Sequence, residues 1–271
     1  MRSWLPTSSP DPPQFTAEVP SAHLRRLLKP LVAVNGQTQL TISDDALVAT
    51  SVDDRMVTAV EATLHEGLCH SYDAVPGSIA IDAETLVDVL AAEQNSNEIA
   101  QLQYDPESST LRLTQSSVVH TQPATLDVDV ATPEIDDSPD TRTYHQRSDL
   151  KHAVQYFGAH AAVVAFGYDN TEDACYLEAI SASEATPETT TRYQVAREQR
   201  GTAPPSESVR SVFSATKLRA LVEATPPETL ICADYAEAFP LQLTWDLTGG
   251  DGIEQGTLTE VSALLAPYEV S

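Results

Sequence analysis

The chain contains 271 residues, of which 41% are hydrophobic, so it can fill one large core or two ordinary ones. Its formal net charge of −25 disfavours general attraction to nucleic acid. The same charge predicts that the protein works in a halophilic cytoplasm, where salt screens the repulsion between like charges. The three cysteines are far apart, and there is neither an apolar signal-peptide core nor a run of about 18 apolar residues, so we expect no disulfide framework, secretion or transmembrane helix.

The first 14 residues hold four prolines and three serines and are expected to form a flexible arm. Four helices are predicted after it. The first covers Ser21–Lys29, where leucines recur with helical spacing, and Pro30 is expected to bend or end it. The second begins near Asp82 as its N-cap, and the third begins near Ser148. The fourth begins at Ser214 and stops before two consecutive prolines.

Runs with strand character lie between the helices, and the clearest are Gln39–Ser43, Leu47–Val52, Leu111–Gln115, Arg192–Ala196 and Leu241–Leu247. Because the helix starts near 21, 82, 148 and 214 are 61 to 66 residues apart, the chain is predicted to repeat a unit of one helix and several strands. We therefore expect an α+β protein of two domains, 15–130 and 141–271, each a duplicated unit. The stretch 131–140, rich in proline and acidic residues, is expected to link them.

Seven of the fifteen basic residues lie on three of these helices. They are Arg25, Arg26 and Lys29 on the first helix, Arg147 and Lys151 on the third, and Lys217 and Arg219 on the fourth. On the first and third helices, a spacing of four residues places two bases on one face, away from the apolar stripe. The second helix turns Glu84 and Asp88 outward and has no base. Basic helix faces in so acidic a chain favour a surface that binds phosphate.

The basic residues could also serve two roles unrelated to phosphate. Each basic helix face could be an ordinary solvated surface, and bases elsewhere could pair with the abundant carboxylates. We expect such ion pairs for the arginines of strands and loops, namely Arg55, Arg112, Arg192, Arg197, Arg200 and Arg210.

The segment His65–His70 is an imperfect zinc-protease signature, with Cys69 where the second histidine should be. A metal site would need a helix to bring residues four apart together, but Gly67 and the strand-like run Val57–Leu64 predict a loop. No nucleophile elbow, P-loop or dinucleotide-binding fingerprint occurs. We therefore expect no bound metal, no cofactor and no enzymatic activity.

Several further stretches are informative through their order along the chain. They are Phe15 with the leucines that follow it, Asp44–Val57, Ser71–Ala74, Phe239-Pro240, Gly256 and Leu265–Pro267. Together with the four helices, this order resembles the archaeal and eukaryotic sliding clamps of the proliferating cell nuclear antigen (PCNA) family. The segment Ser71–Ala74 is similar to one in haloarchaeal members. The likeness spans about residues 15–268.

The resemblance implies a ring of three identical subunits, whose helices line a central hole and whose strands form the outer layer. The seven helical bases would then contact the phosphates of duplex DNA without reading its sequence. A hydrophobic pocket beneath the linker would dock short peptides of a DNA polymerase, clamp loader, nuclease or ligase. The matching positions are Val52, Ile135, Pro240, Leu264, Ala266 and Pro267. Subunits would join through edge strands around Val118–Pro123 and Thr190–Ala196.

Two features depart from the family pattern: the arm before Phe15 and the absence of a base on the second helix. They leave two alternatives to a main replicative clamp. One is an accessory or mobile-element clamp. The other is a clamp-fold scaffold for protein interactions that does not stably encircle DNA.

Overall fold

The computed structural model describes residues 14–34, 37–92, 98–126, 130, 139, 141–158, 161–180, 191–198, 206–237, 239–248 and 260–267. The predicted arm up to residue 13, Ile135 with nearly all of the predicted linker, Arg200 and the glycine turn at 249–252 lie outside these residues. The domain boundary at 131–140 therefore stays a prediction.

The first half of the chain contains two α-helices, one 3-10 turn (η1) and ten strands in its described part. In chain order these are β1 (Gln14–Pro20), α1 (Ser21–Val32), β2 (Gln37–Ile42), β3 (Ala46–Val52), β4 (Thr58–His65), η1 (Glu66–Leu68), β5 (Ser71–Val75), β6 (Gly77–Asp82), α2 (Ala83–Ala92), β7 (Ile99–Asp105), β8 (Thr110–Gln115), β9 (Val118–Pro123) and β10 (Thr125–Leu126).

The second half repeats the same theme. Its described elements are β11 (Thr141–Gln146), α3 (Arg147–Gly158), β12 (Val163–Asp169), β13 (Ala174–Ile180), β14 (Arg192–Val195), β15 (Val209–Ser214), α4 (Ala215–Ala224), β16 (Leu230–Tyr235), β17 (Leu241–Asp246) and β18 (Glu260–Leu265). In each half, two strands run directly into helices, as β1 into α1, β6 into α2, β11 into α3 and β15 into α4. The predicted combination of helices and antiparallel strands is confirmed.

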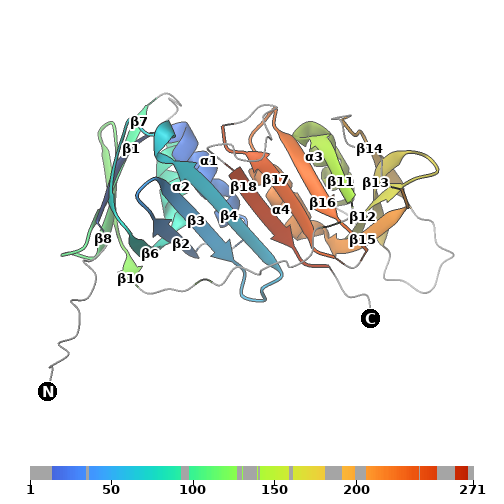
Figure 1. Cartoon of the computed structure of the whole chain (residues 1–271), viewed down its shortest axis with the longest axis horizontal. Coiled ribbons are helices and arrows are strands. Elements are labelled where there is room, and N and C mark those ends of the chain that lie inside the picture. Colours follow the sequence, from blue (N-terminus) through green and yellow to red (C-terminus); the bar gives the residue numbers. More distant parts are fainter. Residues whose placement is uncertain are drawn as a thin grey trace, which may run out of the picture.

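Three antiparallel sheets organise these strands (Figure 1). A nine-stranded sheet, ordered β10-β6-β2-β3-β4-β18-β17-β16-β11, crosses the middle of the molecule, because β4 of the first half pairs with β18 of the second. A five-stranded sheet, β5-β1-β7-β8-β9, stands at one end, and a four-stranded sheet, β14-β13-β12-β15, stands at the other. The helices lie behind the nine-stranded sheet in the view of Figure 1.

The second and fourth helices begin where their capping residues predict. The Asp82 carboxylate accepts hydrogen bonds from the backbone N–H groups of Glu84 and Thr85, at 3.0 and 3.3 Å, and Ser214 caps α4. The predicted end of the first helix is wrong, because α1 continues through Pro30 to Val32. Pro30 and Leu31 are buried in the core, and this packing offsets the hydrogen bond that proline cannot donate.

The strand predictions are confirmed with ends shifted by at most two residues, as for Gln39–Ser43, which becomes β2 (Gln37–Ile42). The loop predicted at His65–His70 is also present. There β4 ends at His65, and the single 3-10 turn η1 follows before β5 begins. No group of histidine, cysteine and acidic side chains that could hold a metal occurs within the described ranges. None of the described helices is long and apolar enough to cross a membrane.

His145 lies fully buried in the second half. Its Nδ1 is 2.8 Å from the carbonyl oxygen of Ala196, and its Nε2 is 2.9 Å from Oγ1 of Thr143. Burial is the main cause that lowers the pKa of His145 to about 4, from an ordinary value of 6.5. The imidazole is therefore neutral in the folded protein at neutral pH.

We expect this histidine to make the protein acid-sensitive. Between pH 6.5 and about 4 the unfolded chain binds a proton at His145 that the folded protein does not, so stability falls as the pH falls through this range, by on the order of 3 kcal/mol. Chemical unfolding at several pH values measures the loss. The variant His145→Gln should show a shallower dependence, whereas His152→Gln, at an exposed position of α3, should match the wild type.

Candidate nucleic-acid interface and docking surface

Packing sets the order of the helices in their layer. Helix α1 contacts α2 on one side and α4 on the other, and α3 contacts α4. The three basic helices are therefore neighbours, and the acidic helix α2 lies at the end of the row. The two halves of the chain meet between α1 and α4, so a surface formed by the predicted bases has to cross this seam.

Four of the predicted bases share one electrostatic environment around Lys29. The Nζ of Lys29 donates a hydrogen bond of 3.0 Å to the backbone carbonyl of Glu223. Packing of the ammonium group against α4 lowers the pKa of Lys29, and the charges of Arg147, Arg25 and Lys151 lower it further. Since Arg147 also donates to the carbonyl oxygen of Glu223, α1 and α3 bring bases together from opposite halves of the chain.

Arg147 is bound to the same end of α4 as Lys29. Its Nε and Nη2 donate to the carbonyl oxygens of Val222 and Glu223, both at 3.3 Å. The last carbonyls of a helix lack intrahelical partners and carry partial negative charge, so they attract cations. Lys29 and Arg147 therefore join α1 and α3 through the C-terminal turn of α4.

Arg25 and Arg26 are neighbours on α1 with different surroundings. Arg26 is half-buried, and its guanidinium donates to the backbone carbonyls of Leu247 and Thr248, beyond β17. Arg25 is exposed and, like Lys151, makes no hydrogen bond or ion pair with any residue that the structure describes. Arg25 and Lys151 are therefore available to a ligand, and Arg26 also fastens α1 to the second half.

The two bases of α4 are paired with carboxylates. Lys217 Nζ lies 3.1 Å from Oδ2 of Asp53, across the seam, and Arg219 Nε lies 2.9 Å from Oε1 of Glu223. The side chain of Asp53 is only 8% exposed, and its Oδ1 accepts the N–H groups of Val57 and Thr58. Burial opposes ionisation, but these hydrogen bonds and Lys217 lower the pKa of Asp53, so it is ionised.

The predicted docking positions gather on the outer side of the seam. In the registers of β3, β4 and β18, Ala59 lies opposite Val52 on one side and Leu264 on the other, so the three side chains share one face. Val52 and Leu264 are half-buried, as are Pro240, Ala266 and Pro267. Five of the six predicted positions therefore lie at or beside the junction between the halves.

Two apolar residues of this surface are absent from the sequence-based set. Met56 is 59% exposed and Val57 is 38% exposed, in the turn between β3 and β4. The carbonyl of Val57 accepts the N–H of Ala266, at 2.8 Å, which fixes the turn against the end of β18. The signal in the sequence is an apolar pair directly after the charged run Asp53–Arg55, where a solvated turn would be polar.

The two strands expected to join subunits are both edge strands. Strand β9 ends the five-stranded sheet, and β14 ends the four-stranded sheet at the opposite end of the molecule. Strands at such edges have unpaired backbone groups that can bind a further strand. Tyr193 of β14 packs against Tyr156 of α3, with ring centroids 5.8 Å apart, and Tyr156 is 56% exposed.

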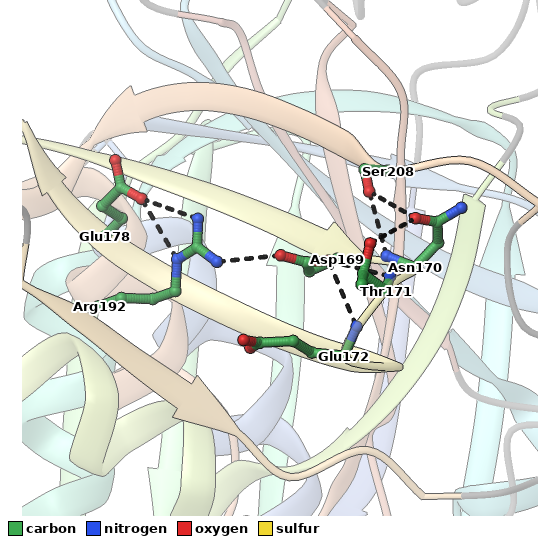
Figure 2. Close-up of polar contacts among 7 residues, drawn as sticks. All are labelled: Asp169, Asn170, Thr171, Glu172, Glu178, Arg192 and Ser208. Atoms are coloured by element: carbon green, nitrogen blue, oxygen red, sulfur yellow. Dashed lines mark hydrogen bonds and ion pairs between the residues drawn. The ribbon is translucent and has the colours of Figure 1, made fainter.

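A polar network holds β14 to the rest of its sheet. Figure 2 shows Arg192 between Glu178, at 3.4 Å, and Asp169, at 3.1 Å. The Arg192 guanidinium lies 3.9 Å from the centre of the Tyr176 ring, and Arg210 also pairs with Glu178. The expected ion pairs are thus confirmed for Arg192 and Arg210, and also for Arg197, which binds Asp173. Arg55 and Arg112 make no ion pair within the described part of the chain.

Comparison with known proteins defines the class of this fold. No family model matches the chain. Among solved structures, that of the A. fulgidus PCNA bound to the C-terminal region of FEN-1 superimposes with a TM-score of 0.74 at 16% identity, covering 95% of this chain and 99% of that one. The fold is therefore the PCNA-type sliding-clamp fold.

Sequence comparison finds similarity to proteins of the same class. It is 22% identical over 257 residues to the DNA polymerase sliding clamp of Natronomonas pharaonis, covering 93% of this chain and 98% of the relative. It is 24% identical to that of Halobacterium salinarum strain R1, with the same coverage. The predicted resemblance is confirmed, because the chain is similar over nearly its whole length to sliding clamps of haloarchaea.

Proposed function

We propose that this protein is a DNA polymerase sliding clamp, which encircles duplex DNA as a ring and tethers replication or repair proteins. The observation that carries the proposal is that Lys29 of α1 and Arg147 of α3, from opposite halves of the chain, both bind the backbone carbonyl of Glu223. Arg25 and Lys151 lie on the same two helices, in a chain whose net charge is −25. A local basic surface in so negative a protein is a surface for phosphate.

The proposed DNA-facing set is Arg25, Arg26, Lys29, Arg147, Lys151, Lys217 and Arg219. Bases on helices of this kind contact phosphates and leave base edges unread, as a sliding protein requires. Affinity for phosphate falls steeply as the salt concentration rises. In a halophilic cytoplasm, enclosure of the duplex therefore has to keep the protein on DNA. The role needs no metal, cofactor or catalytic group.

Partner proteins would bind the outer surface formed by Val52, Pro240, Leu264, Ala266 and Pro267. Ile135, which lies outside the described residues, stays a predicted member of this site. The exposed Met56 and Val57 extend this surface. The A. fulgidus PCNA structure contains the C-terminal region of FEN-1, which supports a peptide as the occupant. A DNA polymerase, clamp loader, nuclease or ligase would each present such a peptide.

Ring closure would pair β9 of one subunit with β14 of the next. We expect light scattering in about 2–3 M KCl, where surface charge is fully screened, to give three times the mass of the chain. A mass equal to one chain, at concentrations up to the solubility limit, would contradict the ring.

An accessory clamp is the second candidate, and the acidic helix α2 favours it. Glu84 and Asp88 are exposed there, and the helix has no base. Deletion of the gene distinguishes the roles, because cells survive the loss of an accessory clamp and do not survive the loss of the main one. A scaffold that does not enclose DNA would instead remain a monomer in the scattering experiment.

A further inference from the structure

A carboxylate lies within the basic surface itself. Glu223 occupies the last turn of α4, where its Oε1 is 2.9 Å from Nε of Arg219. Its backbone carbonyl accepts Lys29 Nζ at 3.0 Å and Arg147 Nη2 at 3.3 Å. Three of the seven proposed phosphate contacts, one from each basic helix, therefore bind this single residue.

The groups that Glu223 offers are those that a DNA phosphate would offer. A phosphate presents a full negative charge on oxygens that accept hydrogen bonds from arginine and lysine. Glu223 presents a carboxylate and, beside it, a carbonyl at the negative end of a helix dipole. Its charge is felt at Lys29, where it raises the pKa against the larger effects of burial and of Arg147 and Arg25.

We propose that Glu223 is an intramolecular competitor for DNA phosphate. It binds basic residues of the helix layer when DNA is absent, and it weakens their binding to phosphate when DNA is present. This inference rests on the proposed clamp function. The Arg219–Glu223 pair is accessible to solvent, with side chains 45% and 37% exposed, so a phosphate can reach and displace it. Ion pairs this exposed contribute little to stability and exchange partners readily.

The consequence for function is a clamp that holds DNA more loosely than its count of bases suggests. Glu223 neutralises Arg219 directly, and its charge also acts on Lys29. Contacts that exchange between a carboxylate and successive phosphates would let the ring move along the duplex without a deep energy minimum at any position.

The test uses the variant Glu223→Gln, which keeps the size and helix propensity of the side chain and removes its charge. Its control is Glu84→Gln, which removes the same charge from the exposed face of α2, where the described residues include no partner for that carboxylate. Fluorescence anisotropy with a short linear duplex, at several KCl concentrations, gives the dissociation constant and its salt dependence for each variant.

We expect Glu223→Gln to bind about threefold to tenfold more tightly than Glu84→Gln, with a salt slope steeper by about 0.9, because one further phosphate contact forms. The additional substitution Arg219→Gln should remove this gain. If Glu223→Gln and Glu84→Gln bind alike while the wild type binds DNA, the competitor role of Glu223 is wrong and the clamp function stands. If no form binds the linear duplex at any salt concentration, the competitor role of Glu223 is wrong, and retention on a circular plasmid then decides the clamp function.

Discussion

Replacement of Arg25 and Lys151 together by glutamate is expected to weaken binding to duplex DNA about tenfold or more and to reduce the salt slope by about 1.8, since two phosphate contacts are lost. These residues are chosen because neither makes an ion pair or hydrogen bond with a described residue. The free energy of unfolding should therefore stay close to that of the wild type. Anisotropy with linear duplex and chemical unfolding measure the two quantities.

Its control is the pair Arg55→Glu and Arg112→Glu, which changes the net charge by the same amount. Both arginines are exposed, and they lie in the turn after β3 and on β8, so neither belongs to a helix. An equal loss of DNA binding in this control would show that only net charge matters, and the proposed surface would then be wrong. Arg26→Glu is unsuitable as a test because it also removes the bonds to Leu247 and Thr248.

The largest expected effect on stability comes from Asp53→Ala. This change leaves the N–H groups of Val57 and Thr58 without their acceptor and removes the partner of Lys217, so the free energy of unfolding should fall by about 2–4 kcal/mol. Asp54→Ala, at the exposed neighbouring position, should have almost no effect. Equal stabilities of the two variants in urea would contradict this account of Asp53.

The same substitution should weaken peptide docking. Asp53 holds the turn that presents Met56 and Val57, and Val57 in turn binds the end of β18. Since the folded pKa of Asp53 is lowered, its contribution is present above an ordinary pKa of 3.8 and is lost as the pH falls through the lower folded value. Asp53 is therefore ionised at neutral pH and holds the turn there. The affinity for a FEN-1 C-terminal peptide at this pH should be lower for Asp53→Ala than for the wild type.

Features that depend on neighbouring residues were predictable from the sequence. Asp82 and Ser214 cap the second and fourth helices as expected, because capping needs only the next three residues. The leucine stripe of α1 follows from helical spacing alone. The end of this helix was not predictable, since the burial of Pro30 and Leu31 depends on the tertiary core.

The roles of single bases were beyond the reach of the sequence for the same reason. Arg25 and Arg26 are adjacent and equivalent in any helical projection, yet Arg26 binds carbonyls 221 and 222 residues away. Lys217 reaches Asp53 in the other half of the chain. Such partners follow from the way the halves pack at the seam, which no local pattern encodes.

Enclosure of DNA is the central claim, and topology tests it most directly. A circular plasmid is incubated with the protein and a clamp loader, and one portion of the sample is then linearised by a single cut. The circular and linear samples pass through a gel-filtration column in about 2–3 M KCl, where phosphate contacts alone do not hold a protein on DNA. We predict that the protein stays with the circle and leaves the linear form. Equal loss from both forms, or equal retention on both, would contradict enclosure.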